Sequence, residues 1–228
     1  MKRQLSYLAI LMLVAACTLP ELEETESTQT ETQSTVSTLI VTTTTNKPNI
    51  TQTTTGQQPV SILIEPEHDG GYERKLFKHW SDIDNDGCDT RREVLIEESQ
   101  TAVAIGTKCS LQGGRWYSAF DGIETTDPST FDVDHMVPLK EAWDSGAWAW
   151  DPTRREAFAN DMSIPESLIA VSASSNRSKG AKDPAEWMPP SEDVHCSYLA
   201  AWIAVKQHWG LSMDQAEHDA ISASRISC

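Results

Sequence analysis

The sequence predicts an α+β fold in a single domain that is stapled by disulfides. Residues 60–228 have the length of one ordinary domain. An apolar run that ends before Pro138 indicates a strand, and apolar side chains at helical spacing near the C-terminus indicate a helix. Four cysteines in the same stretch indicate covalent bridges. We therefore expect short strands packed against helices.

The first 17 residues have the features of a bacterial lipoprotein signal. Lys2 and Arg3 precede an apolar segment, Leu5 to Val14, that is too short to span a bilayer. Small residues then lead to Cys17, which stands where a lipobox cysteine is diacylated. We expect a lipid anchor on Cys17 and a protein on the extracellular side of the membrane. An ordinary cleaved signal that releases a secreted protein is the alternative.

Residues 18–59 consist mainly of Thr, Ser, Gln and Glu. This composition cannot bury enough apolar surface to offset the chain entropy that folding removes. We interpret the segment as a disordered tether between the anchor and the domain.

The domain carries a large excess of negative charge. The chain has 34 acidic and 18 basic residues, and removing the five acidic and three basic residues of positions 1–59 leaves 29 against 15. This balance excludes tight nucleic-acid binding through a broadly basic surface. A nucleic-acid substrate must instead meet a local basic site or a bound cation.

The end of the chain predicts an antiparallel helical hairpin. Gly210 ends a first helix, and residues 212–215 (S-M-D-Q) have the form of a capping box that begins a second. The first helix is indicated by four side chains at helical spacing: Tyr198, Trp202, Val205 and Trp209.

This hairpin also predicts the disulfide pairing. Cys196 and Cys228 fall at the same end of two antiparallel helices, so we expect them to be bonded to each other. Cys88 and Cys109 are then left to form the second bridge. A zinc site is the alternative, although no C-x-x-C spacing supports it.

A carboxylate and an imidazole stand side by side at Asp134-His135, and Asn176 follows in a later polar cluster. Hydrolysis of a phosphodiester requires a base that activates water and a charge that neutralises the phosphate. Histidine is the natural base near neutral pH, and carboxylate and amide oxygens suit a hard divalent cation. These are the parts of a one-metal phosphodiesterase. A capping Asp and a structural His are the alternative.

Two segments resemble the HNH nuclease signature: D-V-D-H-M-V-P-L at 132–139 and N-R-S-K-G at 176–180. They are similar to the HNH domain of CRISPR effector nucleases. They are closer still to secreted HNH proteins related to the C-terminal domain of the GmrSD restriction enzymes. Those proteins share the D-H-x-V-P-L-x-x-A-W-x-S-G-A stretch at 134–147, Asn160-Asp161, and D-P-A-x-W at 183–187.

This resemblance implies a ββα-metal core, in which two short strands and a helix grip one cation, Mg²⁺ or Mn²⁺. It implies that His135 is the general base and that Asp134 and Asn176 bind the cation. It assigns Asn160 to the Asn that orients the base. Three basic residues would contact phosphates as point charges or forks: Arg91, Arg177 and Lys179.

Residues 82–93 match the calcium-loop pattern D-x-D-x-D-G-x5-E. The carboxylates of Asp82, Asp84 and Asp86 alternate so that they can converge on one ion, and Glu93 can close the shell. The loop is thus a candidate Ca²⁺ site. An acidic surface turn anchored by Cys88 is the alternative.

The sequence therefore predicts a monomeric, metal-dependent HNH endonuclease that cleaves nucleic acid, DNA in preference to RNA, outside the cell. The rival interpretation is a non-catalytic surface lipoprotein, stabilised by calcium, on a decayed nuclease fold. The intact Asp134, His135 and Asn176 argue against decay.

Overall fold

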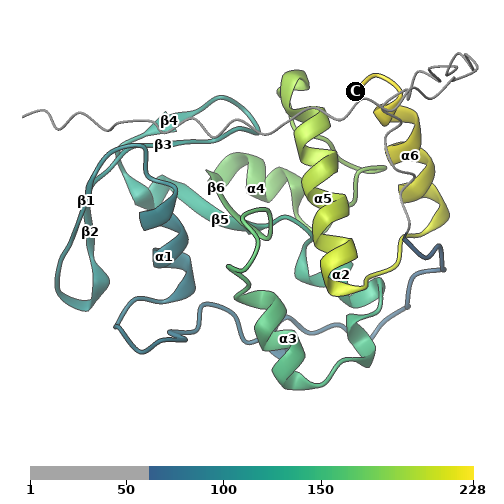
Figure 1. Cartoon of the computed structure of the whole chain (residues 1–228), viewed down its shortest axis with the longest axis horizontal. Coiled ribbons are helices and arrows are strands. Elements are labelled where there is room, and N and C mark those ends of the chain that lie inside the picture. The colour runs from purple at the N-terminus through teal and green to yellow at the C-terminus, as the bar shows by residue number, and fades with distance from the viewer. Residues whose placement is uncertain (1–61) are drawn as a thin grey trace, which may run out of the picture. The chain divides into compact units, whose positions relative to one another are not determined.

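Residues 62–228 are described by a computed structural model (Figure 1). The expected signal segment with Cys17, and the tether at 18–59, lie outside the described residues. The described chain combines helices with small antiparallel sheets, which confirms the α+β prediction. No helix among residues 62–228 is both long and apolar enough to cross a membrane.

Three two-stranded antiparallel sheets form within the described residues. Their strands are β1 (Val103–Ile105) with β2 (Leu111–Gly113), β3 (Trp116–Tyr117) with β4 (Glu124–Thr125), and β5 (Phe131–His135) with β6 (Leu168–Ser172).

Six α-helices connect and cover these sheets in the described part of the chain. They are α1 (Thr90–Glu97), α2 (Leu139–Asp144), α3 (Pro152–Ala159), α4 (Ala173–Lys179), α5 (His195–Trp209) and α6 (Gln215–Arg225). Short 3-10 helices lie at Arg74–Leu76, Thr107–Cys109, Pro128–Thr130, Ala147–Ala149 and Glu192–Val194.

The β5–β6 pair and α4 occupy the centre of the domain in Figure 1. The register pairs Asp134 with Ile169 and His135 with Leu168. The chain enters α4 directly from β6, because the hydroxyl of Ser172 accepts a hydrogen bond from the Ser175 N–H and caps the helix. A strand pair followed at once by a helix therefore positions the polar motifs found in the sequence.

Two apolar clusters hold this unit from either side. A smaller one joins α1 to the sheet and contains Leu95, Trp116, Phe131 and Val133. The larger one fills the space among α2, α3, α5 and α6. Trp202 is fully buried in it, and the indole N–H donates to Glu217 on α6. The strand pair is thus fixed on both sides by buried side chains.

The C-terminal hairpin has the predicted form. Gly210 ends α5 in the left-handed conformation with φ 66°. The second helix begins at a different cap from the one predicted, because Asp214, not Ser212, accepts from the N–H of Glu217. The predicted bridges Cys88–Cys109 and Cys196–Cys228 are both present.

Candidate active site

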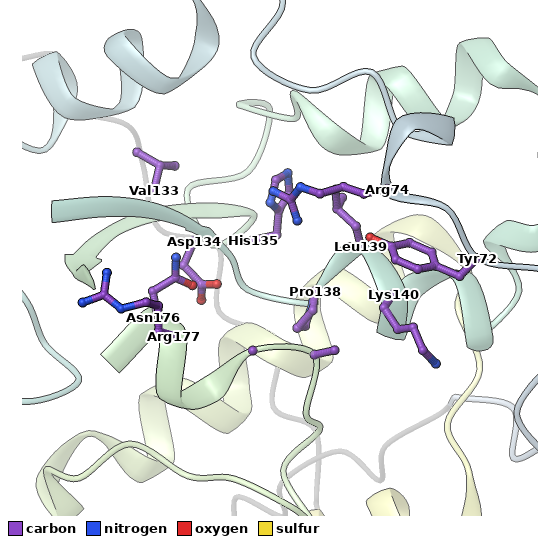
Figure 2. Close-up of a pocket in the computed structure, with 12 residues that line it drawn as sticks. Tyr72, Arg74, Val133, Asp134, His135, Pro138, Leu139, Lys140, Asn176 and Arg177 are labelled. Atoms are coloured by element: carbon purple, nitrogen blue, oxygen red, sulfur yellow. The ribbon is translucent and has the colours of Figure 1, made fainter. Parts of the chain in front are cut away.

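Four of the predicted site residues, Asp134, His135, Asn176 and Arg177, line one pocket of about 450 Å³ at the end of β5. Asp134 and His135 leave the strand at its last two positions, just before Pro138 precedes α2. Figure 2 shows Asn176 and Arg177 on α4 beside Asp134, and Arg74 on the side of His135. The strand end and the helix therefore place these functional groups around one cavity.

His135 is buried and held in a defined orientation. Its Nε2 lies 2.9 Å from the carbonyl oxygen of Ala159, which can only accept a hydrogen bond. Nε2 therefore carries the hydrogen, and Nδ1 keeps a free lone pair. The ring stacks between Trp80 and Phe158, with centroids 5.2 and 6.4 Å away. Burial lowers the pKa of His135 to about 3, and the Arg74 charge adds to this effect. The imidazole is thus a neutral base at physiological pH.

Asp134 is paired inside the protein. The ammonium of Lys179 lies 2.5 Å from its Oδ2, and both side chains are almost entirely removed from solvent. Lys179 also donates to the carbonyls of His135 and Met136, at 2.8 and 2.9 Å. The expectation that Lys179 contacts phosphate is therefore corrected: its three partners and its burial keep it inside, where it holds Asp134 and the turn after β5.

Asn176 turns its amide group in a direction that suits a cation ligand. Its Nδ2 donates to Oδ2 of Asp132 at 3.0 Å. This bond fixes the orientation of the amide group. The carbonyl oxygen, Oδ1, takes no part in the bond and remains able to bind a cation. Asp132 is a residue that our site prediction did not include. Its place two residues before Asp134, on the same side of the strand, was the available signal.

The side-chain hydrogen bonds of Asn160 within residues 62–228 do not go to the imidazole. Its side chain accepts from the N–H of Ser81 and donates to the carbonyls of Lys78 and Glu156. The preceding residue, Ala159, supplies the carbonyl that binds His135. Asn160 thus ties the end of α3 to residues 78–81.

The two predicted arginines differ in position. Arg177 is exposed, lines the pocket and makes no ion pair among residues 62–228. Arg91 donates to the carbonyl of Phe131 at 2.8 Å, at the opposite end of β5 from His135. The structure therefore brings Arg177 to the site, and it uses Arg91 to fix the strand.

Tyr72 and Arg74 also line the pocket, although no sequence motif marks them. They belong to the segment before α1, which reaches the site from outside the strand–helix unit (Figure 2). Only the folded chain brings them close to His135, so sequence spacing carried no signal of their role.

The donor set around Asp134 fits a hard divalent cation. Lys179 occupies Oδ2, and Oδ1 accepts no hydrogen bond from residues 62–228. One free carboxylate oxygen and one amide oxygen from Asn176 border the same cavity. Few protein ligands and remaining open positions are the arrangement that Mg²⁺ and similar ions prefer.

The acidic loop forms a second oxygen-rich group. Ligand oxygens of Asp82, Asp84 and Asp86 lie within 4.8 Å of one another, and all three residues are exposed. Glu93 lies outside this set in the first turn of α1. Burial and then the neighbouring aspartates raise its pKa. The loop therefore has the geometry of a candidate cation site.

Two comparisons with known proteins identify relatives. Residues 89–224 match the family described as GmrSD restriction endonucleases, C-terminal domain. An uncharacterized secreted protein of Arthroderma benhamiae is 39% identical over 183 residues, covering 79% of this chain and 88% of that protein. No solved structure matches the chain. The family match begins at residue 89, so it leaves out Tyr72 and Arg74.

Proposed function

This chain belongs to the family of GmrSD restriction endonuclease C-terminal domains, and we propose that it is a metal-dependent HNH endonuclease. It hydrolyses phosphodiester bonds of nucleic acid, DNA in preference to RNA. The observation that carries this proposal is the neutral His135, whose free Nδ1 borders a pocket that also holds Asp134, Asn176 and Arg177.

His135 acts as the general base in this proposal. The Ala159 carbonyl fixes the proton on Nε2, so Nδ1 is the atom that takes a proton from water. The flanking aromatic rings keep the imidazole neutral and limit its rotation. Asn160 is a positioning residue, because it anchors the end of α3 from which the Ala159 carbonyl projects.

Asp134 and Asn176 would hold the cation, Mg²⁺ or Mn²⁺. A bound divalent ion would neutralise charge on the scissile phosphate and stabilise the leaving oxygen. Lys179 keeps Asp134 in place from inside the fold, and Asp132 does the same for Asn176. The chain thereby fixes both ligand oxygens before an ion arrives.

Arg177 and Arg74 bring positive charge to the pocket of a domain whose overall charge is negative. Both line the pocket, and Arg177 is exposed there. Guanidinium groups bind phosphate oxygens through paired N–H donors. The substrate phosphate is thus bound at the site itself. We expect cleavage with little sequence preference, because the described site has contacts for phosphate and for a cation but no evident element that would contact base edges.

Export is supported by the secreted relative and by the two disulfides, which form in oxidising compartments. We propose that Cys17 carries a lipid anchor, that residues 18–59 are the tether and residues 60–228 the nuclease domain, and that the protein acts as a monomer.

We also propose Ca²⁺ as a structural ion in the acidic loop. The clustered oxygens of Asp82, Asp84 and Asp86 support this assignment. The test is a melting series in Ca²⁺, in which a variant carrying Asp84→Ala and Asp86→Ala should lose a stabilisation that His135→Ala keeps. An equal shift in the two variants would place the ion elsewhere.

A plasmid-nicking assay tests the nuclease. We expect activity with Mg²⁺ or Mn²⁺, no activity with chelator, and no activity in His135→Ala. The matched control is His208→Ala, because His208 is exposed at the end of α5. A His135→Ala variant that nicks as fast as His208→Ala would favour the rival interpretation of a decayed fold.

A further inference from the structure

A further acidic group, apart from the active site and the acidic loop, is drawn from four separate segments of the chain. Glu67 is common to two groups of three, in each of which the ligand oxygens lie within 4.8 Å of one another. The segments are the N-terminal strap (residues 62–76), helix α2, the loop after α4 and the start of α6. The five residues are Glu67, Glu141, Asp144, Asp183 and Asp214.

Asp144 leaves one oxygen of this group without a partner. Its Oδ2 pairs with Lys140, whereas its Oδ1 is buried and has no hydrogen-bond partner among the described residues. The residue is only 5% exposed. A buried carboxylate oxygen without a partner costs free energy, and it can be satisfied only by a donor or by a cation. The acidic group thus contains a buried carboxylate oxygen that lacks a hydrogen-bond partner among the described residues.

The neighbouring lysines do not balance the charge. Lys140 serves Asp144, and Lys206 is shared between Glu141 and Glu217. No lysine or arginine pairs with the other three carboxylates of the group within residues 62–228. Burial, and then repulsion from Glu141, Asp144 and Asp214, raises the pKa of Glu67 to about 7. The group therefore carries excess negative charge at neutral pH.

We propose that this group binds one Ca²⁺ ion, with Glu67 as the ligand that the strap contributes. Ca²⁺ takes six to eight oxygen ligands in a flexible geometry, which suits carboxylates drawn from several segments. A proton on Glu67 shared with Asp144 is the competing way to satisfy the free oxygen, and it predicts no bound ion.

The ion would fasten the strap to the domain. The strap already pairs with the rest of the fold through its backbone, from Glu65 to Met213 and from His68 to Asp144. A few residues beyond Glu67 the strap delivers Tyr72 and Arg74 to the pocket of His135 (Figure 2). Ca²⁺ at Glu67 thus stabilises the part of the chain that carries Arg74. A consequence for catalysis rests on the proposed nuclease function, whereas the binding itself does not.

The experiment compares two substitutions that remove the same charge from the strap. The parent is the full chain carrying Asp82→Asn, Asp84→Asn and Asp86→Asn, which removes the carboxylates of the acidic loop. Glu67→Gln and Glu65→Gln are each added to this parent. Ca²⁺ binding is then measured by titration calorimetry. We expect Glu67→Gln to bind one ion fewer per chain, or to bind that ion at least tenfold more weakly. Glu65→Gln should stay within about twofold of its parent.

Thermal melting in chelator guards against a variant that simply misfolds. Glu67→Gln should melt at or above the temperature of its parent without Ca²⁺, because it relieves repulsion, and it should gain less from added Ca²⁺. The proposal is overturned if Glu67→Gln and Glu65→Gln bind Ca²⁺ equally. It is also overturned if the parent binds a single Ca²⁺ ion that both variants retain. Neither readout depends on nicking, so a failed nuclease assay leaves this result interpretable.

Discussion

Lys179 Nζ lies 2.5 Å from Asp134 Oδ2, with Lys179 fully buried and Asp134 at 5% exposure. Burial raises the pKa of Asp134 and lowers that of Lys179, and their mutual attraction opposes both shifts. The pair therefore depends on both partners being present, and it joins the end of β5 to the end of α4.

Loss of this lysine should destabilise the fold strongly. Lys179→Met leaves a buried carboxylate without its partner, and we expect a loss of about 3 kcal/mol in the free energy of unfolding, measured in urea. Asp134→Asn in the same chain should recover part of it. Lys182→Met is the control, because that exposed lysine only bonds the carbonyl of Ser178. Equal losses for the two lysines would contradict a structural role for the pair.

The sequence predicted side-chain chemistry better than side-chain direction. Asp134, His135 and Asn176 share a pocket as predicted, because a strand end and a helix that follows at once leave few arrangements. Lys179 stands three positions after Asn176 and could have faced phosphate or the core. Only the packing of α4 on β5 decides this, and the sequence does not encode it locally.

Contacts between residues that are distant in sequence were the other feature that the sequence predicted only in part. Both disulfides followed from the helical hairpin, because antiparallel helices bring their far ends together. Arg74 and Glu67 come from a segment without periodicity or a motif. Their neighbours in space are distant in sequence, so no spacing rule could place them.

The pH dependence of cleavage should lack the usual histidine limb. Burial lowers the pKa of His135 to about 3, so the base stays neutral from pH 8 down to about pH 4. At saturating metal, kcat/KM should show no acid limb with an apparent pKa near 6.5. Suppose that kcat/KM does fall with an apparent pKa near 6.5, and that no substitution of another histidine removes this fall. The buried, neutral state of His135 would then be contradicted.

Substitution of Arg177 and substitution of Arg91 should have different effects on kcat/KM. Arg177 borders the pocket, so Arg177→Ala should lower kcat/KM by roughly tenfold to a hundredfold, the value of one or two charge-assisted hydrogen bonds. Arg91 bonds the Phe131 carbonyl, so Arg91→Ala should reduce stability and leave kcat/KM within about threefold. Equal kinetic losses at matched stability would return Arg91 to the phosphate site.

Stability in chelator should fall as the pH rises through the titration of Glu67. Its pKa is about 7 in the folded state, raised from 4.5 by burial and by Glu141, Asp144 and Asp214. Between pH 4.5 and 7 the folded protein keeps a proton that the unfolded chain has lost. The stabilisation is therefore complete below pH 4.5 and lost above about pH 7.

The measurement is urea unfolding in chelator from pH 4.5 to 8. Glu67→Gln should flatten this slope, whereas Glu65→Gln should keep it. The change should stay below about 1 kcal/mol, because Glu67 is largely exposed and solvent screens its repulsion. Burial also raises the pKa of Asp144 and of Asp183, so a residual slope of the same sign is expected. In the background of Asp82→Asn, Asp84→Asn and Asp86→Asn, saturating Ca²⁺ should restore more stability at pH 8 to Glu65→Gln than to Glu67→Gln, since an ion takes the place of the proton. A Glu67→Gln slope as steep as that of Glu65→Gln would show that Glu67 is not coupled to the acidic group.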